Sequence, residues 1–180
     1  MSVRLSLLAL LDQGSCYGYQ LRTELDWRTG SSGPINVGQI YNTLDRLERD
    51  KLVRKTGDNN CYEITTLGSA EVAGWFESVS TLADLPAKLA LAATLPGVDV
   101  EAIIRGQRTN ADRVAIDSDT PKDAAELAAV IVARADTAAA TSEARLLDDV
   151  ESLLELGIAP RAISSEVPRR GRPRKVPAAR

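Results

Sequence analysis

Residues Asn36–Val53, NVGQIYNTLDRLERDKLV, give the clearest indication of the fold in this sequence. Asn36 is a residue type favoured at helix N-caps, and it follows a proline and a Gly-Ser turn. Ile40, Leu44 and Leu47 then come at i, i+4 and i+7, which is the spacing of one face of a helix. The pattern predicts a short amphipathic helix with one buried face.

The opposite face of this predicted helix is polar, and the four side chains assigned to it include no acid. They are Gln39, Asn42, Thr43 and Arg46. Amides pair with adenine, guanidinium groups with guanine or phosphate, and hydroxyls with either. Such a face is typical of a recognition helix in a DNA major groove. A surface helix with a solvated polar face has the same pattern, so this helix alone leaves both interpretations open.

Two further helices are predicted before it. Val3–Leu11, with Ser2 as its cap, is apolar nearly all round and should be buried on most sides. A second helix is predicted from Ser15, with its apolar stripe at Tyr17, Leu21 and Leu25. Gly18 inside this helix indicates a close packing contact, and Arg28–Gly33 is a predicted turn. The order indicates a helix-turn-helix.

A β-hairpin is predicted directly after the third helix. Two short strands with period-two patterning, near Val53–Lys55 and Tyr62–Ile64, flank a Gly-Asp-Asn-Asn turn. A helix-turn-helix followed by a hairpin is a winged helix. The wing carries Arg54, Lys55, Asn59 and Asn60. In isolation its two basic residues are more often solvated charges, but their place beside the recognition helix favours contact with phosphates or the minor groove.

Four motifs follow one another here in a fixed order and spacing. They are Leu7-Leu8-Ala9-Leu10-Leu11; Gly14 with Tyr17-Gly18-Tyr19-Gln20-Leu21; Gly38-x-Ile40-Tyr41-x-x-Leu44-x-x-Leu47-Glu48 with Leu52-Val53; and Tyr62-x-Ile64-Thr65-x-x-Gly68. Over residues 3–68 this series resembles the PadR family of transcriptional regulators, and the rest of the chain resembles its longer-tailed branch. The resemblance implies a homodimeric winged-helix repressor with a dimer built by C-terminal helices. It also implies release from DNA by a small aromatic or drug-like effector.

Three positions connect the chain to this family or depart from it. The family's recognition-helix tyrosine corresponds to Tyr41, which would contact a DNA phosphate or pack at the helix start. Lys51 stands where the family usually has a glycine after this helix, so the helix end is either strained or built differently. Tyr17 replaces a frequent histidine. Neither departure touches the outer face of the recognition helix.

The composition argues against an enzyme. The 180 residues include no histidine, which removes histidine bases, Ser-His and Cys-His pairs and most zinc sites, so neither a cofactor nor a metal is expected. The two cysteines, Cys16 and Cys61, lack a ligand cluster and are better explained as incidental buried thiols than as a redox pair. No apolar run reaches membrane-spanning length, and no signal peptide is indicated. We expect a cytoplasmic, nucleoid-associated protein.

The net charge of −3 hides an asymmetry along the chain. Residues 1–68 contain 8 Lys/Arg and 8 Asp/Glu, whereas residues 69–160 contain 7 and 16. Residues 161–180 contain 7 Lys/Arg and 1 Asp/Glu. The acidic middle should stay away from DNA, and the basic end should seek an anion.

Helices are predicted for most of the middle. Their expected bounds are Ser69–Val79, Asp84–Thr94, Asp99–Ile116 and Pro121–Leu156. Trp75 and Phe76 in the first of them either form a wall of an effector pocket or, as we favour, pack in the core or dimer interface. The last helix carries an apolar stripe too long for anything but a helical partner. It indicates an arm that dimerises by exchange with its twin, with a monomeric helical hairpin as the alternative.

The basic end contains Arg170-Gly171-Arg172-Pro173 flanked by basic residues, which resembles an AT-hook. Glycine lets the backbone lie deep in a narrow minor groove, two arginines extend along it, and proline turns the chain back toward the phosphates. The alternative is a disordered basic tail that binds phosphates without preference.

The sequence thus predicts a mainly α protein with a small β-hairpin: a winged helix-turn-helix domain (1–68), a C-terminal α-helical dimerisation domain (69–160) and a disordered basic tail (161–180). The predicted function is a sequence-specific DNA-binding regulator, as a homodimeric repressor with a small aromatic effector. The partners are double-stranded DNA and a second copy, with no membrane. The alternatives are an architectural, nucleoid-type DNA binder dominated by the tail, a protein-interaction module, and a cysteine redox sensor.

Overall fold

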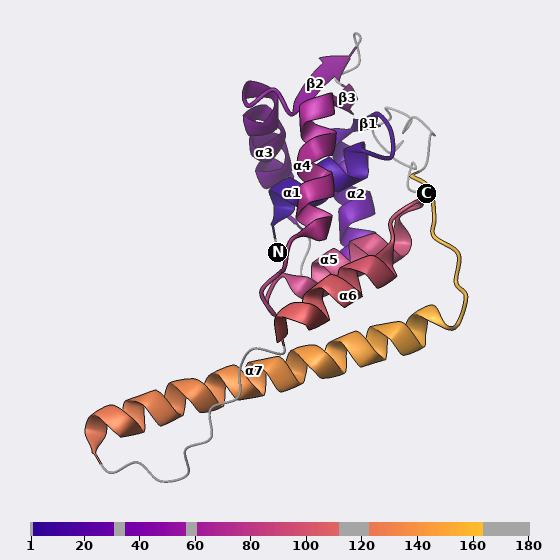
Figure 1. Ribbon diagram of the computed structural model, residues 1–180. Helices are drawn as coiled ribbons and strands as arrows, with labels where there is room; N and C mark the ends of the chain where they lie inside the picture. The colour runs from indigo at the N-terminus through magenta and orange to yellow at the C-terminus, as the bar shows by residue number, and fades with distance from the viewer. Residues whose placement is uncertain (1, 31–34, 57–60, 112–122, 164–180) are drawn as a thin grey trace, which may run out of the picture.

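The computed structural model describes residues 2–30, 35–56, 61–111 and 123–163. Figure 1 shows α1 to α4 and a small sheet stacked on α5 and α6, with α7 as a long rod beneath them. The elements are α1 (Val3–Leu11), β1 (Cys16–Tyr17), α2 (Gly18–Thr29), α3 (Val37–Arg49), β2 (Val53–Thr56), β3 (Cys61–Ile64), α4 (Thr66–Glu77), α5 (Leu85–Thr94), α6 (Val100–Ala111) and α7 (Ala124–Leu154). The predicted fold class, a winged helix with C-terminal helices, is confirmed.

The sheet has three antiparallel strands in the order β1-β3-β2, one more than the predicted hairpin. Val53 pairs with Ile64, and Cys16 pairs with Tyr62. The prediction of a helix from Ser15 was therefore wrong, because residues 16–17 are extended and α2 begins at Gly18. A strand of two residues is too short to show a periodic pattern in the sequence, and it becomes extended only because it pairs with β3.

Helix α1 is the centre of the winged-helix core, as predicted. The hydroxyl of Ser2 accepts a hydrogen bond from the Leu5 amide at 3.5 Å and caps the helix. Leu7, Leu8 and Leu10 are fully buried between α2, α3, α4 and β3. Because other elements cover α1 on all sides at residues 6–11, its sequence is apolar around the whole helix and not only on one face.

Several predicted boundaries differ from the observed ones. Helix α2 runs to Thr29 and ends at Gly30 with φ 54°, so the turn predicted from Arg28 starts later and Arg28 is a buried helical residue. Helix α4 begins at Thr66, not Ser69. The Thr65 hydroxyl caps it by accepting from the Gly68 amide at 3.2 Å.

The linkage between α4 and the C-terminal helices is made by polar side chains. Lys88 of α5 is fully buried and donates to the carbonyl of Ser78, which ends α4. Burial lowers the pKa of Lys88, and the carbonyl end of a helix is a favourable place for its charge. Gln107 of α6 exchanges hydrogen bonds with the backbone of Ser80 and donates to Glu143 of α7 at 2.7 Å.

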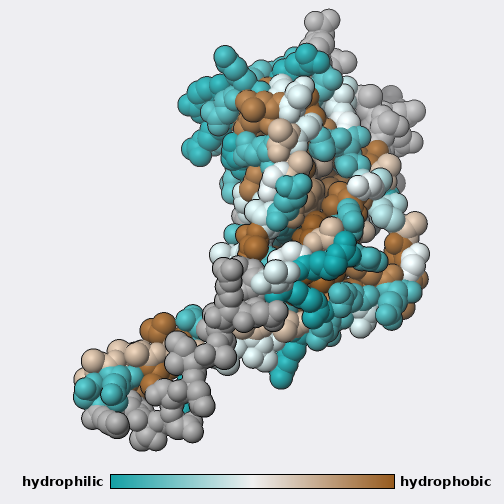
Figure 2. Space-filling model, in the orientation of Figure 1, coloured by the Kyte–Doolittle hydropathy of each residue, from teal (hydrophilic) through white to brown (hydrophobic). Residues whose placement is uncertain are grey.

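Helix α7 is packed along only half its length. Leu147 is fully buried in a second core formed with α5 and α6, and Arg108 of α6 pairs with Asp148 at 2.6 Å. The other half projects, with Leu127 49% and Ile131 59% exposed. Figure 2 shows hydrophobic side chains gathered on this projecting end. Within the described residues, no helix is long and apolar enough to cross a membrane.

After α7 the chain returns to the winged helix (Figure 1). The amide of Arg161 donates to the carbonyl of Thr94 at 3.1 Å, and Ile163 packs against the winged-helix core. Residues 161–163, which the sequence analysis assigned to the basic tail, are therefore held against the folded body.

Candidate DNA-binding surface

The start of α3 is fixed by its own cap and by α2. The side-chain oxygen of Asn36 accepts from the Gly38 amide at 2.8 Å. Arg22 of α2 donates to the carbonyl of Ile35 at 2.8 Å, and Asp26 accepts from the Ile35 amide at 3.2 Å. Two helical side chains thus set the direction in which α3 leaves the core.

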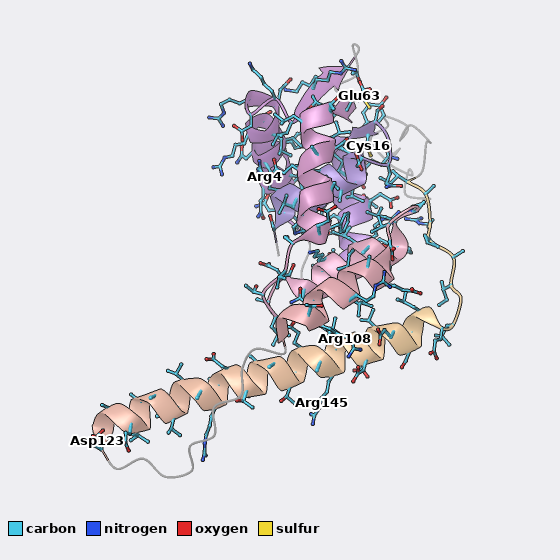
Figure 3. All side chains as sticks on the ribbon, viewed as in Figure 1. Arg4, Cys16, Glu63, Arg108, Asp123 and Arg145 are labelled. Atoms are coloured by element: carbon cyan, nitrogen blue, oxygen red, sulfur yellow. The ribbon has the colours of Figure 1, made fainter. Side chains whose placement is uncertain are left out.

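The predicted inner face of α3 is confirmed. Ile40, Leu44 and Leu47 are all fully buried. They pack against α1 and α2, so one side of α3 is unavailable to any partner. The outer side is thereby fixed in solvent, and Figure 3 shows side chains of α3 extending away from the rest of the molecule.

The predicted DNA-facing residues of α3 lie on that outer side. Gln39, Asn42 and Arg46 are exposed, whereas Thr43 is half-buried. The Thr43 hydroxyl donates to the Gln39 carbonyl at 2.7 Å, so its proton is already used inside the helix. The structure therefore brings together two amides and a guanidinium group on one exposed face.

Two residues that the sequence analysis left out also lie on α3. Arg49 is exposed and stands one helical turn after Arg46, a spacing that could have revealed it. Asp45 is exposed and stands three positions after Asn42, which places the two on neighbouring parts of the helix surface, so the face is not free of acids. Within the described residues, neither Arg46 nor Arg49 makes an ion pair, which leaves both charges available.

Tyr41 is held in place by a glycine. A Cβ atom added at Gly18 would lie 2.7 Å from the ring of Tyr41, closer than any real contact. The close packing predicted at Gly18 is thus its contact with α3. The ring packs directly on the backbone of α2 at Gly18, which fixes its position. Tyr41 is still 40% exposed, beside the polar face of α3.

The end of α3 accommodates Lys51 without glycine. Lys51 has φ 61°, and it is the one non-glycine residue with positive φ in the described ranges. Its amide donates to the carbonyl of Glu48 at 3.0 Å, and the Leu52 amide donates to that of Leu47 at 2.9 Å. These two bonds form a Schellman motif, with buried Leu52 and Leu47 as its apolar contact. The end is therefore regular in hydrogen bonding and strained only at Lys51.

The basic residues of the wing are paired with acids. Arg54 binds Glu63, its cross-strand partner, at 3.0 Å. Lys55 binds Glu48 at 2.7 Å and Asp45 at 3.6 Å, and its ammonium lies 5.4 Å from the ring of Tyr62.

The hydrogen bond that Lys55 donates to Glu48 raises the pKa of Lys55 above its ordinary value. All five charged groups are exposed or half-exposed, so these pairs are screened by solvent and can exchange for a phosphate. The predicted Asn59 and Asn60 lie outside the described residues.

The winged-helix part of the sequence is similar to a known protein family. Residues 7–74 match the model of the transcriptional regulator PadR-like family. The matched residues run from within α1 to within α4. The match covers 68 of the 180 residues, so the similarity to this family is shown for this part of the chain. No curated protein matches the chain.

Three solved PadR or PadR-like structures are similar to this chain. Bacillus subtilis PadR in complex with p-coumaric acid is 18% identical, with a TM-score of 0.39 over 87% of this chain and 98% of that chain. The same protein in complex with operator DNA is 18% identical, with a TM-score of 0.35 over 87% and 98%. The PadR-like transcriptional regulator BC1756 from Bacillus cereus is 19% identical, with a TM-score of 0.39 over 84% and 99%.

Trp75 and Phe76 line two different hollows. Their rings stack at 4.9 Å with a 33° tilt, and both side chains are half-buried. Phe76 faces a cleft of about 520 Å³ between α1, α4 and the start of α6. Trp75 faces a smaller hollow of about 190 Å³. Both rings also touch the winged-helix core, so packing accounts for part of each.

The two cysteines are poorly suited to redox chemistry. Burial raises the pKa of Cys16 to about 12, and burial also raises that of Cys61. Cys16 pairs with Tyr62 and Cys61 with Tyr17, so their side chains point to opposite faces of the sheet. The thiolates that react with oxidants are therefore disfavoured at both positions.

The AT-hook-like residues Arg170, Gly171, Arg172 and Pro173 lie outside the described residues. Within the described ranges, no group of three or more potential metal-ligating side chains occurs.

Proposed function

We propose that this PadR-like protein is a sequence-specific DNA-binding regulator that acts as a homodimeric repressor. The observation that carries the proposal is the outer face of α3, where exposed Gln39 and Asn42 stand beside Arg46 and Arg49. Amides and guanidinium groups are the side chains that pair with base edges in a major groove. In a dimer, the two α3 helices would enter half-sites about 34–36 Å apart.

The residues around α3 would orient it on the phosphates. Braced Tyr41 and the capping residue Asn36 are exposed at one end, and Lys55 and Arg54 stand at the other. Contacts of this kind fix orientation without selecting sequence. We assign the same role to Asn59 and Asn60, and Thr43 would contribute through its methyl group.

The bare half of α7 supports the homodimer. Leu127, Ile131 and Val132 are 49–60% exposed on a helix that projects from the body. A long apolar stripe of this kind is stabilised by another helix, and a second copy supplies one with the same stripe. Ile131→Asp should give a monomer in light scattering, while Leu67→Asp, at an equally exposed leucine of α4, should leave the dimer intact.

The cleft beside Phe76 is where we place a small aromatic effector. Val72, Val98 and Ile103 give it apolar walls, and its rim carries the acids Asp12, Glu77 and Asp99 without a basic residue. A flat apolar ligand fits such a lining. An aromatic ligand that displaces the protein from DNA should lose this effect in Phe76→Ala.

The test of DNA recognition is fluorescence anisotropy with the full chain. The labelled duplex comes from the region upstream of the gene, and a shuffled duplex of equal composition is the control. Preference for the upstream duplex by about 1000-fold supports the proposal. Equal affinity for the upstream and the shuffled duplex, together with higher affinity for any A·T-rich duplex, would instead identify an architectural protein of the nucleoid. No salt-sensitive binding would indicate a protein-interaction module.

A further inference from the structure

The cleft beside Phe76, between α1, α4 and the start of α6, has the room and the lining for a small flat ligand. Its volume is about 520 Å³, within the range typical of ligand-binding pockets. Ala9, Val72 and Ile103 supply apolar walls, one from each helix. The ring of Phe76 also lines the cleft, and it stacks on Trp75 at 4.9 Å. An aromatic group can therefore pack there between aliphatic side chains and a fixed ring.

Every charged side chain in the described lining of this cleft is an acid. The three are Asp12 after α1, Glu77 at the end of α4 and Asp99 before α6. Asp99 lies 3.9 Å from a guanidinium nitrogen of Arg105. Asp12 accepts a hydrogen bond from the Ser69 hydroxyl at 2.6 Å. Within the described residues, neither Asp12 nor Glu77 makes an ion pair, so both bring an uncompensated negative charge to the cleft.

The backbone adds to this negative potential. Two helices end in residues that line the cleft, α1 with its C-cap Asp12 and α4 with its last residue Glu77. The carbonyl end of a helix carries a partial negative charge, which favours a nearby cation. Helix α6 instead begins at the cleft, and there Asp99 accepts a hydrogen bond from the Ala102 amide at 2.8 Å. The positive end of α6 is thus already satisfied by a carboxylate.

We propose that this cleft binds an aromatic cation, such as a protonated arylalkylamine, and rejects an aromatic carboxylate. The aromatic group would pack beside Phe76, and the ammonium group would lie toward Asp12 or Glu77. The attraction between a cation and an aromatic ring adds to this preference. A carboxylate ligand would meet like charges instead. The inference rests on the proposed function, because it assigns a ligand class to the effector cleft proposed there.

The test uses three probes that share one ring system and differ in charge: naphthylmethylamine, naphthylmethanol and naphthoate. At neutral pH the amine is positive, the alcohol is neutral and the acid is negative. Isothermal titration calorimetry with the full-length protein measures the affinity for each probe at low and at high salt. The amine should bind most tightly and the acid most weakly. Added salt should weaken binding of the amine and leave that of the alcohol unchanged.

Two substitutions remove the free charges of the cleft and keep its shape: Asp12→Asn and Glu77→Gln. Together they should lower the affinity for the amine about fivefold, the modest contribution of partly exposed ion pairs, and leave that for the alcohol unchanged. Glu155→Gln is the matched control for Glu77→Gln. It removes an exposed carboxylate at the end of α7, away from the cleft, and should change neither affinity. Circular dichroism checks that each variant is folded.

Tighter binding of the amine than of the alcohol, lost in the double variant, supports the proposal. Equal affinity for amine and alcohol, tightest binding of naphthoate, or an amine affinity that the double variant leaves unchanged overturns it.

Phe76→Ala separates this inference from the proposed function. It should weaken binding of naphthylmethanol as well as of the amine, because both pack beside the ring. Alcohol binding that depends on Phe76, without any preference for the amine, would keep the cleft as an effector site and overturn only the ligand class. If none of the three probes binds, both the ligand class and the effector site fail.

Discussion

The recognition helix α3 and the wing both present basic side chains to solvent, but they differ in whether the charge is already used. Arg46 and Arg49 make no ion pair within the described residues. Arg54 and Lys55 of β2 are bound to Glu63 and to the acids of α3. The same residue types, a few positions apart in sequence, are therefore free on one element and neutralised on its neighbour.

This difference in pairing predicts how the affinity for DNA is divided between α3 and the wing. An unpaired guanidinium group contacts DNA without first breaking a contact inside the protein. A basic group that is already paired must exchange its carboxylate partner for a DNA phosphate. The released carboxylate then repels the phosphate backbone of the DNA. We therefore expect α3 to supply most of the contacts and the wing to adjust them.

The largest effect should come from breaking the support of the wing at Gly68. A Cβ atom there would lie 2.3 Å from the carbonyl oxygen of Leu52, a backbone atom that cannot move aside. Gly68→Ala should lower the free energy of unfolding by about 3 kcal/mol, the cost of overpacking. Gly74→Ala in the same helix meets open space and should raise it by up to about 1 kcal/mol. Urea denaturation measures both, and equal stability of the two variants would contradict the contact.

Removing one free charge from α3 should give the next largest effect. Arg46→Ala should weaken binding to the upstream duplex by about 1–3 kcal/mol, or roughly 5- to 150-fold. Arg54→Ala should cost less, because its side chain must first leave Glu63. Arg105→Ala, at an arginine of α6 whose side chain is 65% exposed against 67% for Arg54, is the control and should change nothing. If anisotropy titrations showed a larger loss of DNA affinity in Arg54→Ala than in Arg46→Ala, the wing rather than α3 would supply the main contact.

The junction between α3 and the wing offers a gain in stability. Lys51 has a left-handed backbone in an otherwise regular Schellman motif, which costs a side chain about 1 kcal/mol. Lys51→Gly should recover about that amount in urea denaturation. Asp50→Gly, where φ is −78°, should instead destabilise the protein through unfolded-state entropy. A loss of stability in Lys51→Gly would mean that the lysine side chain itself stabilises the fold.

Freeing a wing charge should have the smallest effect. Glu63→Gln leaves Arg54 without its carboxylate partner. The change should strengthen DNA binding about twofold and steepen the salt dependence by about one counterion, as expected for one added phosphate contact. Titrations at several salt concentrations measure this slope. An unchanged slope would place Arg54 away from DNA.

The α3 seam could be predicted from sequence because its information is local. Ile40, Leu44 and Leu47 follow the helical period, and Asn36 marks the cap. Strand β1 could not, since Cys16 and Tyr17 become extended only by pairing with β3. Neither could the pairing of Lys55 with Asp45, which depends on how the wing folds back beside α3.

The ion pair between Arg161 and Glu24 depends most strongly on non-local information. Glu24 and Arg161 are 137 positions apart, and nothing near Arg161 distinguishes it from the other basic residues at that end of the chain. Asp45 and Arg49, by contrast, were visible in the sequence of α3. They could have been found by continuing the polar face through the last turn of the helix.

The most direct test of the central claim, that the outer face of α3 selects DNA sequence, is a binding panel. Wild type, Asn42→Ala and Arg54→Ala are each titrated against duplexes that differ by one base pair across the upstream site. Asn42→Ala should lose discrimination at one position by about 1–3 kcal/mol, while Arg54→Ala should keep the wild-type profile at lower affinity. A profile unchanged in Asn42→Ala but altered in Arg54→Ala would mean that α3 does not select the sequence.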